Sequence, residues 1–97
     1  MHNPKHINTG LKIAKLGNFV DIHNCGWPTN NWPVNLCCKT IDGITIYVAL
    51  INRDWSVEWS YDPEMDIRSK MPTRHGIRTQ TEMLGVVKQI LNGEYRK

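Results

Sequence analysis

Four residues whose side chains could bind a metal ion or do nucleophilic chemistry lie within one stretch of the chain: His23, Cys25, Cys37 and Cys38. Imidazole nitrogens and thiolates are the usual ligands of zinc. Structural zinc sites commonly use two cysteines separated by a short turn, which directs both sulfurs at one ion. Cys37 and Cys38 are adjacent, so on a strand they point to opposite faces. The spacing therefore predicts inert thiols, no metal site and no cofactor.

A second metal pattern fails at specific positions. Asp62, Glu64 and Asp66 alternate as at the start of a calcium-binding loop. Such a loop needs glycine at its sixth position and a bidentate glutamate at its twelfth. This chain has Ile67 and Thr73 there, so we expect no calcium site.

The case for catalysis is equally weak. A cysteine close to a histidine, such as Cys25 near His23, could supply a nucleophile and its base. No neighbouring residue in the sequence activates either group, and the seven glycines are scattered rather than gathered in a phosphate-binding loop. We therefore expect this protein not to be an enzyme.

Alternating residues predict a meander of three strands over residues 34–61. The runs are 34–41, 44–51 and 55–61, and the middle run is apolar on both faces, which predicts a central strand. Asp42-Gly43 favours a two-residue hairpin turn. In that register Ile41 pairs with Ile44.

The turn near residues 52–54 leaves two alternatives. A three-residue loop places Trp55, Val57 and Trp59 beside Tyr47 on one face, whereas a two-residue loop places them beside Ile46 on the other. A slip of one residue moves a whole set of side chains across the sheet, so both alternatives stay open at this point.

Before the meander, the sequence indicates less regular structure. We expect residues 1–10 to be a poorly ordered lead-in. Residues 11–16 suit either a short strand or one or two helical turns opened by Thr9. Residues 19–23 read as a strand, and two Trp-Pro dipeptides mark residues 24–33 as a loop.

After the meander, residues 64–76 form a long connection, and a helix follows. Thr79 and Glu82 make a capping box, an apolar stripe at helical spacing follows, and Asn92-Gly93 is a typical helix end. We predict an α+β fold: an antiparallel sheet of four or five strands with a C-terminal helix, about 79–91, packed on one face.

Length and composition set broad limits. Ninety-seven residues, 40% of them hydrophobic and 22% charged, predict one small domain spanning 1–97. The longest apolar run, 47–51, is too short to span a membrane. With no secretory signal and three cysteines, we expect a cytoplasmic protein with reduced thiols.

The predicted meander carries more apolar surface than one helix can cover, which indicates a protein-binding module. Aromatic and arginine side chains dominate protein contacts. Residues 68–78 are basic and lack acids, which favours a partner with an acidic surface. The expected partner-binding residues are Tyr47, Trp55, Trp59, Tyr61, Arg68, Lys70, Arg74 and Arg78.

Three further expectations complete this interpretation. Small size, mild charge and tryptophan richness resemble small bacteriophage or bacterial accessory proteins, which suggests an inhibitor or adaptor that occludes a larger partner. The alternative is a nucleic-acid-binding protein that uses the basic loop and aromatic sheet residues. A second copy of the chain, forming a homodimer, could also close an exposed apolar face.

Overall fold

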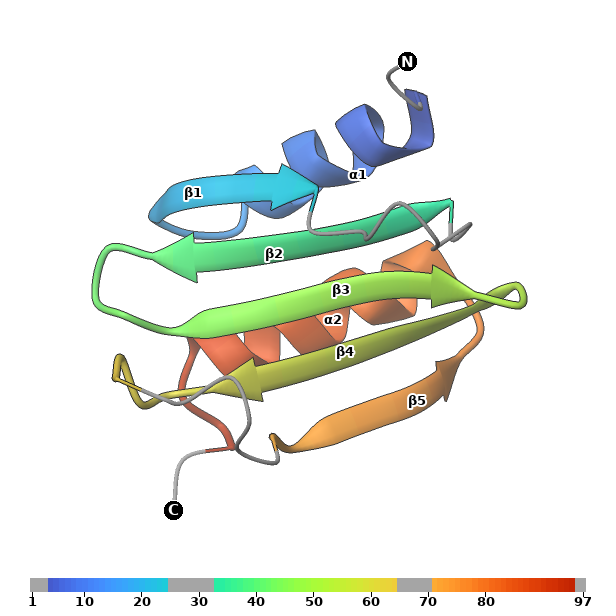
Figure 1. Cartoon of the computed structure of the whole chain (residues 1–97). Coiled ribbons are helices and arrows are strands. Elements are labelled where there is room, and N and C mark those ends of the chain that lie inside the picture. The colour runs from blue at the N-terminus through green and yellow to red at the C-terminus, as the bar shows by residue number, and fades with distance from the viewer. Residues whose placement is uncertain (1–3, 25–32, 65–70, 96–97) are drawn as a thin grey trace.

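A computed structural model describes residues 4–24, 33–64 and 71–95. Within these ranges five strands and two helices follow one another, and Figure 1 shows their arrangement. Their bounds are α1 Pro4–Ala14, β1 Phe19–Asn24, β2 Val34–Thr40, β3 Thr45–Ile51, β4 Asp54–Ser60, β5 Thr73–Ile77 and α2 Gln80–Leu91.

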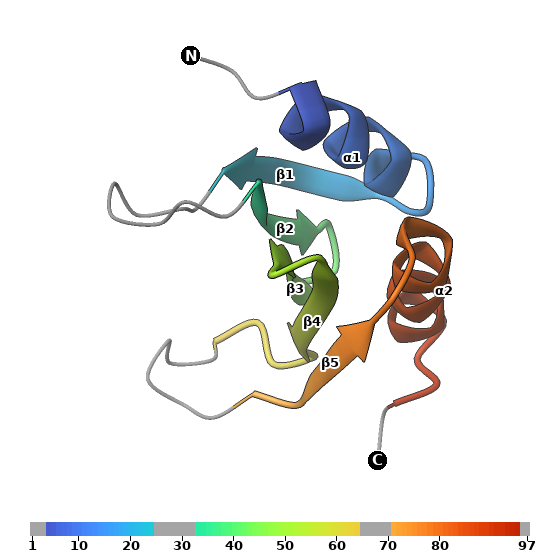
Figure 2. The same ribbon diagram turned by 90° about the vertical axis from the view of Figure 1, so that its right-hand side faces the viewer.

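The strands form one antiparallel sheet in the order β1-β2-β3-β4-β5. Helix α2 packs against β4 and β5, and α1 contacts β1, β2 and α2. Figure 2 shows α2 on one side of the sheet and α1 beside β1. This architecture confirms the predicted α+β fold with a C-terminal helix on one face of the sheet.

The turn between β2 and β3 differs from the prediction by one residue. Lys39 lies opposite Thr45, and the N–H of Thr40 donates to the carbonyl of Ile44 at 3.0 Å. The loop therefore has three residues, 41–43, and Gly43 takes the left-handed conformation (φ 93°) that such loops require at their last position. The predicted pairing of Ile41 with Ile44 is wrong.

The turn between β3 and β4 resolves the open alternative. Ile51 lies opposite Asp54, so the loop has two residues, Asn52 and Arg53. Their φ angles of 51° and 72° are both positive, as a type I′ hairpin turn demands. Trp55 consequently lies opposite Leu50 rather than beside Tyr47.

Together the two turns place the large apolar side chains of three strands on the face that the helices cover. Val34, Leu36 and Cys38 lie opposite Leu50, Val48 and Ile46, which in turn lie opposite Trp55, Val57 and Trp59. All nine side chains are at most 8% exposed. In the predicted register the aliphatic residues of β2 and β3 would have been divided between two faces. Burial of a single continuous apolar face explains why the longer loop prevails.

The N-terminal segment is more regular than the sequence indicated. Helix α1 begins at Pro4, so residues 4–10, expected as a poorly ordered lead-in, are helical. Ile13 and Thr9 are fully buried. The Thr9 hydroxyl accepts a hydrogen bond from Gln80 Nε2 at 3.2 Å, and Lys12 Nζ donates to Gln80 Oε1 at 2.7 Å. These contacts join α1 to the first turn of α2.

A fifth strand, β5, begins inside the segment that the sequence marked as a long connection and ends one residue beyond it. β5 pairs with β4, where Arg74 lies opposite Val57 and Ile77 opposite Trp55. The register shifts between these two pairs, which is a β-bulge. Gly76 lies in the bulge with a positive φ of 68°, a conformation that glycine adopts without strain.

Helix α2 begins and ends where the sequence predicted. Thr79 is the N-cap, and its hydroxyl accepts from the N–H of Glu82 at 3.1 Å. At the other end, the N–H of Glu94 donates to Gln89 C=O at 3.1 Å and that of Gly93 to Ile90 C=O at 3.0 Å. This pair of bonds is a Schellman motif.

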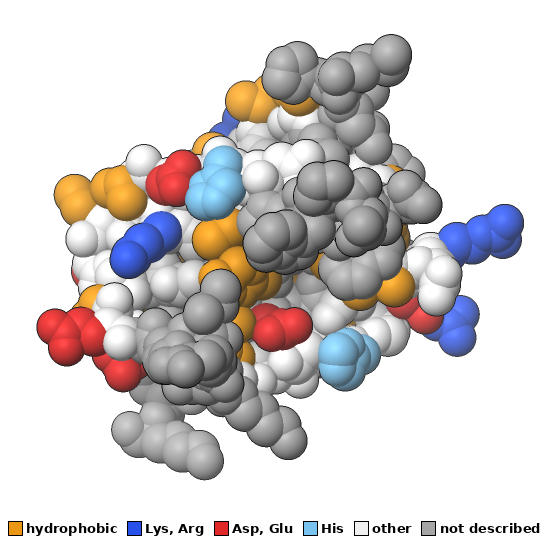
Figure 3. Space-filling model, viewed as in Figure 1, with side chains coloured by type: hydrophobic (Ala, Val, Ile, Leu, Met, Phe, Trp, Pro, Cys, Tyr) orange, Lys and Arg blue, Asp and Glu red, His pale blue; other side chains and the backbone are white. Residues whose placement is uncertain are grey.

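The second face of the sheet is more polar, and no described helix covers it. Its residues include Asp21 and His23 on β1, Cys37 on β2, Tyr47 on β3 and Glu58 on β4, all partly or largely exposed. Figure 3 shows acidic, basic and histidine side chains interspersed over the coloured part of this view, without a broad patch of one charge.

Candidate functional site

Two of the predicted contact residues belong to the hydrophobic core. Trp55 is 5% exposed and Trp59 is 7% exposed. The Trp59 ring packs against Tyr95, with ring centroids 4.8 Å apart and planes inclined at 38°. The two-residue turn at Asn52 puts both indoles under α2. The expectation that they form an exposed contact surface is therefore replaced by a core position.

The two predicted tyrosines lie on opposite faces. Tyr61 is partly buried, and its hydroxyl donates to the carbonyl of Ile90 at 2.7 Å, which ties the end of β4 to α2. Tyr47 is half-buried on the polar face, where it lies between Cys37 on β2 and Glu58 on β4. Of the four predicted aromatic contacts, only Tyr47 lies on the face that α2 leaves uncovered.

Two of the predicted cations, Arg74 and Arg78, lie on β5 or directly after it. Arg74 is exposed on that strand, with Nη1 3.5 Å from the hydroxyl of Tyr95. Arg78 follows the strand with a side chain that is 83% exposed, and its Nε is 3.9 Å from Asp54 Oδ1. Arg68 and Lys70 lie outside the described residues.

The potential zinc ligands divide between the faces of the sheet. His23 lies opposite Cys37 on the polar face, whereas Cys38 is fully buried in the core. His23 Nδ1 is 2.8 Å from Asp21 Oδ2. Within residues 4–24, 33–64 and 71–95, no three His, Cys, Asp or Glu side chains lie close enough to hold a metal ion. Cys25 lies outside these ranges.

The environment of Cys37 does not activate its thiol. Burial raises the pKa of this group, and a hydrogen bond with Tyr47 only partly opposes that effect. The thiolate is the reactive form of cysteine, so a raised pKa lowers its reactivity at neutral pH. Although His23 and Cys37 are neighbours across the strands, the arrangement lacks the lowered pKa of a nucleophilic cysteine.

A hydroxyl and an imidazole also meet at the β4–β5 bulge, a juxtaposition that the sequence did not indicate. Ser56 Oγ is 3.1 Å from His75 Nδ1. In a serine hydrolase the second ring nitrogen bonds an orienting carboxylate. Among the described residues no carboxylate hydrogen-bonds to His75. The pair is therefore a cross-strand hydrogen bond that supports the bulge.

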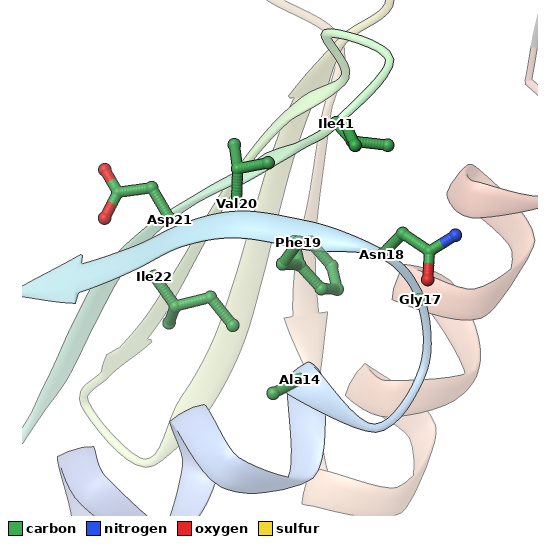
Figure 4. Close-up of a pocket in the computed structure, with 8 residues that line it drawn as sticks. All are labelled: Ala14, Gly17, Asn18, Phe19, Val20, Asp21, Ile22 and Ile41. Carbon is green, nitrogen blue, oxygen red and sulfur yellow. The ribbon is translucent and has the colours of Figure 1, made fainter.

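A hollow in the described surface lies between the end of α1, strand β1 and the β2–β3 turn. This β1 hollow has a volume of about 440 Å³, and Figure 4 shows the side chains around it. Val20 and Ile41 are 62% and 73% exposed. Its lining residues are Ala14, Gly17, Asn18, Phe19, Val20, Asp21, Ile22 and Ile41.

A β-bulge gives the hollow its exposed valine. The pairing of β1 with β2 shifts between Phe19 and Asp21, so Val20 is the extra residue of the bulged strand. Alternation along a regular strand would put Val20 and Ile22 on the same side. Instead, Ile22 packs against the core while Val20 is largely exposed.

An exposed apolar stripe on α1 leads to the same place. Ile7, Leu11 and Ala14 are all exposed, and their i, i+4, i+7 spacing puts them on one side of the helix. Ile7 is 50% exposed and Leu11 59%. Because Ala14 also lines the hollow, this α1 stripe runs into the hollow's edge.

No helix in the described part of the chain is long and apolar enough to cross a membrane. Comparison of the chain with protein-family models, with curated proteins and with solved structures finds no match.

Proposed function

We propose that this protein is a non-enzymatic protein-binding module whose main contact surface is the β1 hollow together with the α1 stripe. One observation carries the proposal: all the large hydrophobic side chains that are markedly exposed in the described residues belong to α1, β1 or the β2–β3 turn. They are Ile7, Leu11, Val20 and Ile41. Clustered apolar exposure of this kind is typical of interaction sites.

The surface suits a protein partner better than nucleic acid. Binding of single strands uses exposed aromatic rings on which bases stack, and Trp55 and Trp59 are covered by α2. Aliphatic side chains around a hollow instead match an apolar anchor of a partner protein. An inhibitor or adaptor acting in the cytoplasm by occlusion is the specific form that we favour, in keeping with the free thiol of Cys37.

The test is a comparison of wild-type protein with the double variant Val20→Ser/Ile41→Ser. Both side chains are mostly exposed, so we expect the far-UV circular dichroism and thermal unfolding to change little. Each substitution removes apolar area that a partner would bury, and the two substitutions together should weaken binding by about tenfold or more. Lys88→Ser, exposed on α2, is the matched control.

The assay is quantitative affinity capture from lysate of the native host, treated with nuclease and read by mass spectrometry. A protein captured by wild-type and by Lys88→Ser, and depleted with the double variant, supports the proposal and identifies the partner for measurement of Kd. Equal capture by all three proteins would refute the assignment of the surface. Loss of all capture on nuclease treatment would favour the nucleic-acid alternative.

A further inference from the structure

The opposite border of the sheet carries a second feature that the β1 hollow does not explain. β5 is the last strand in the sheet order, and Figure 1 shows no described element beyond it. Arg74, His75 and Gly76 are all exposed. A Cβ atom added at Gly76 would meet no atom within 4 Å outside the adjacent residues, so there is open space at this part of the edge.

Hydrogen-bond geometry identifies which backbone groups face outward. The N–H of Trp59 on β4 donates to the carbonyl of Pro72 at 3.1 Å, and Val57 lies opposite Arg74. Successive residues of a strand turn their N–H and C=O groups to opposite sides. The backbone polar groups of Pro72 and Arg74 therefore point toward β4. The N–H and C=O of Thr73, which lies between them, point away from the sheet.

The charges on the β5 edge indicate which kind of segment could pair with it. β5 and the residue after it carry Arg74, His75 and Arg78 and no acid. The acids Asp54 and Glu58 belong to β4, one strand inward. A second copy of β5 would bring like charges together across the new pair, which is unfavourable. An acidic segment would instead place carboxylates near the guanidinium groups.

We infer that the β5 edge binds an acidic segment in extended conformation, which adds to the sheet as a sixth strand. Backbone bonds to Thr73 give this mode its affinity, and side chains on alternate positions give it specificity. Glu58 lies opposite Thr73 on the polar face, so it disfavours a carboxylate there. The acidic side chains of the bound segment therefore lie on the helix side, over Arg74.

A defined probe tests this inference. The probe is a peptide of alternating Thr and Glu, about eight residues long, which is an ordinary strand length. Titration into the full-length protein should shift the amide resonances of β5, and hydrogen exchange at the Thr73 amide should slow. The same peptide with N-methylated threonines, and one of alternating Thr and Lys, should bind at least about fivefold more weakly.

Variants of the protein distinguish recognition by Arg74 from a general attraction of the acidic peptide to positive charge. Arg74→Gln should weaken binding of the Thr-Glu peptide by at least about fivefold, whereas Lys88→Gln, a loss of the same charge on α2, should not. Arg74 is exposed, so the variant should fold normally. No binding of the probe, equal binding of the N-methylated peptide, or protection of Thr73 by self-association without peptide would each overturn the inference.

The proposal for the β1 hollow and the proposal for the β5 edge can be refuted separately. The β1 hollow lies at the other border of the sheet, so Val20→Ser/Ile41→Ser should bind the Thr-Glu peptide as wild-type does. Loss of peptide binding in that variant would contradict a separate site at β5. Loss of partner capture with retained peptide binding is the result expected if both proposals hold.

Discussion

Trp59→Ala should strongly destabilise this protein, because the structure assigns the indole to the core. The side chain is 7% exposed, lies opposite Ile46 and packs on Tyr95. Truncation of a buried tryptophan costs roughly 3–5 kcal/mol through lost burial and the cavity that remains. Domains of this size have a free energy of unfolding of only about 5–15 kcal/mol. The substitution therefore removes a large part of the free energy of unfolding of the wild-type protein.

Urea denaturation followed by far-UV circular dichroism measures this loss. With a slope of about 1–3 kcal/mol per molar urea, a loss near 4 kcal/mol lowers the midpoint by roughly 1.3–4 M. Arg74→Gln, an exposed change on the neighbouring strand, should move the free energy by no more than about 0.5 kcal/mol. A Trp59→Ala midpoint within about 0.3 M of wild-type at an unchanged slope would refute the core assignment and the β3–β4 register behind it.

The ring contact with Tyr95 can be isolated by a double-mutant cycle. Trp59→Ala and Tyr95→Ala, alone and together, should show a coupling of about 0.5–1.5 kcal/mol, the usual worth of an aromatic pair beyond its buried area. A coupling near zero would mean that the two rings stabilise the protein independently.

Four further substitutions test the local structure. Thr79→Ala removes the N-cap of α2 and should lower the free energy of unfolding by about 1 kcal/mol, as measured by urea denaturation. Gly85→Ala, on the exposed side of α2, should raise the free energy of unfolding by about 0.5–1 kcal/mol. Gly43→Ala should lower the free energy of unfolding by a larger amount, because Gly43 has a positive φ and lies against a proline. Equal effects at the two glycines would contradict the turn geometry. Burial raises the pKa of Cys37 above its ordinary 9.0, so above that pH the unfolded chain loses the thiol proton first and stability falls as pH rises through the folded pKa. The wild-type curve should show this extra alkaline decline relative to Cys37→Ser, and identical curves would contradict it.

Local signals in the sequence determined the identity of most elements. The Thr79-Glu82 capping box and Asn92-Gly93 define α2 because their hydrogen bonds involve only residues a few positions apart. Alternation of apolar residues located β2, β3 and β4 within about a residue, since a strand half-buried by a sheet face requires a period of two. These features depend on neighbouring residues alone, so the sequence suffices for them.

Only the tertiary structure decided which side chains are core and which are surface. Asp42-Gly43 correctly marks a hairpin, but two- and three-residue loops both suit it, and the choice reverses the faces of β2 relative to β3. Burial of one continuous apolar face made that choice. The two-residue turn at Asn52 then placed Trp55 and Trp59, which were predicted contact residues, on the same buried face. Such burial depends on residues far apart in the chain, which no local pattern reports.

The β1 hollow and the β5 edge could not be predicted from the sequence for the same reason. Val20 is exposed because the β1–β2 pairing contains a bulge, and Ile41 because the turn is one residue longer than predicted. The short β5 carries few apolar residues, and its pairing with β4 is fixed by distant partners such as Val57. The sequence supplied the candidate residues of the β5 edge, Arg74 and Arg78, while their position on an open strand edge came from the assembled sheet.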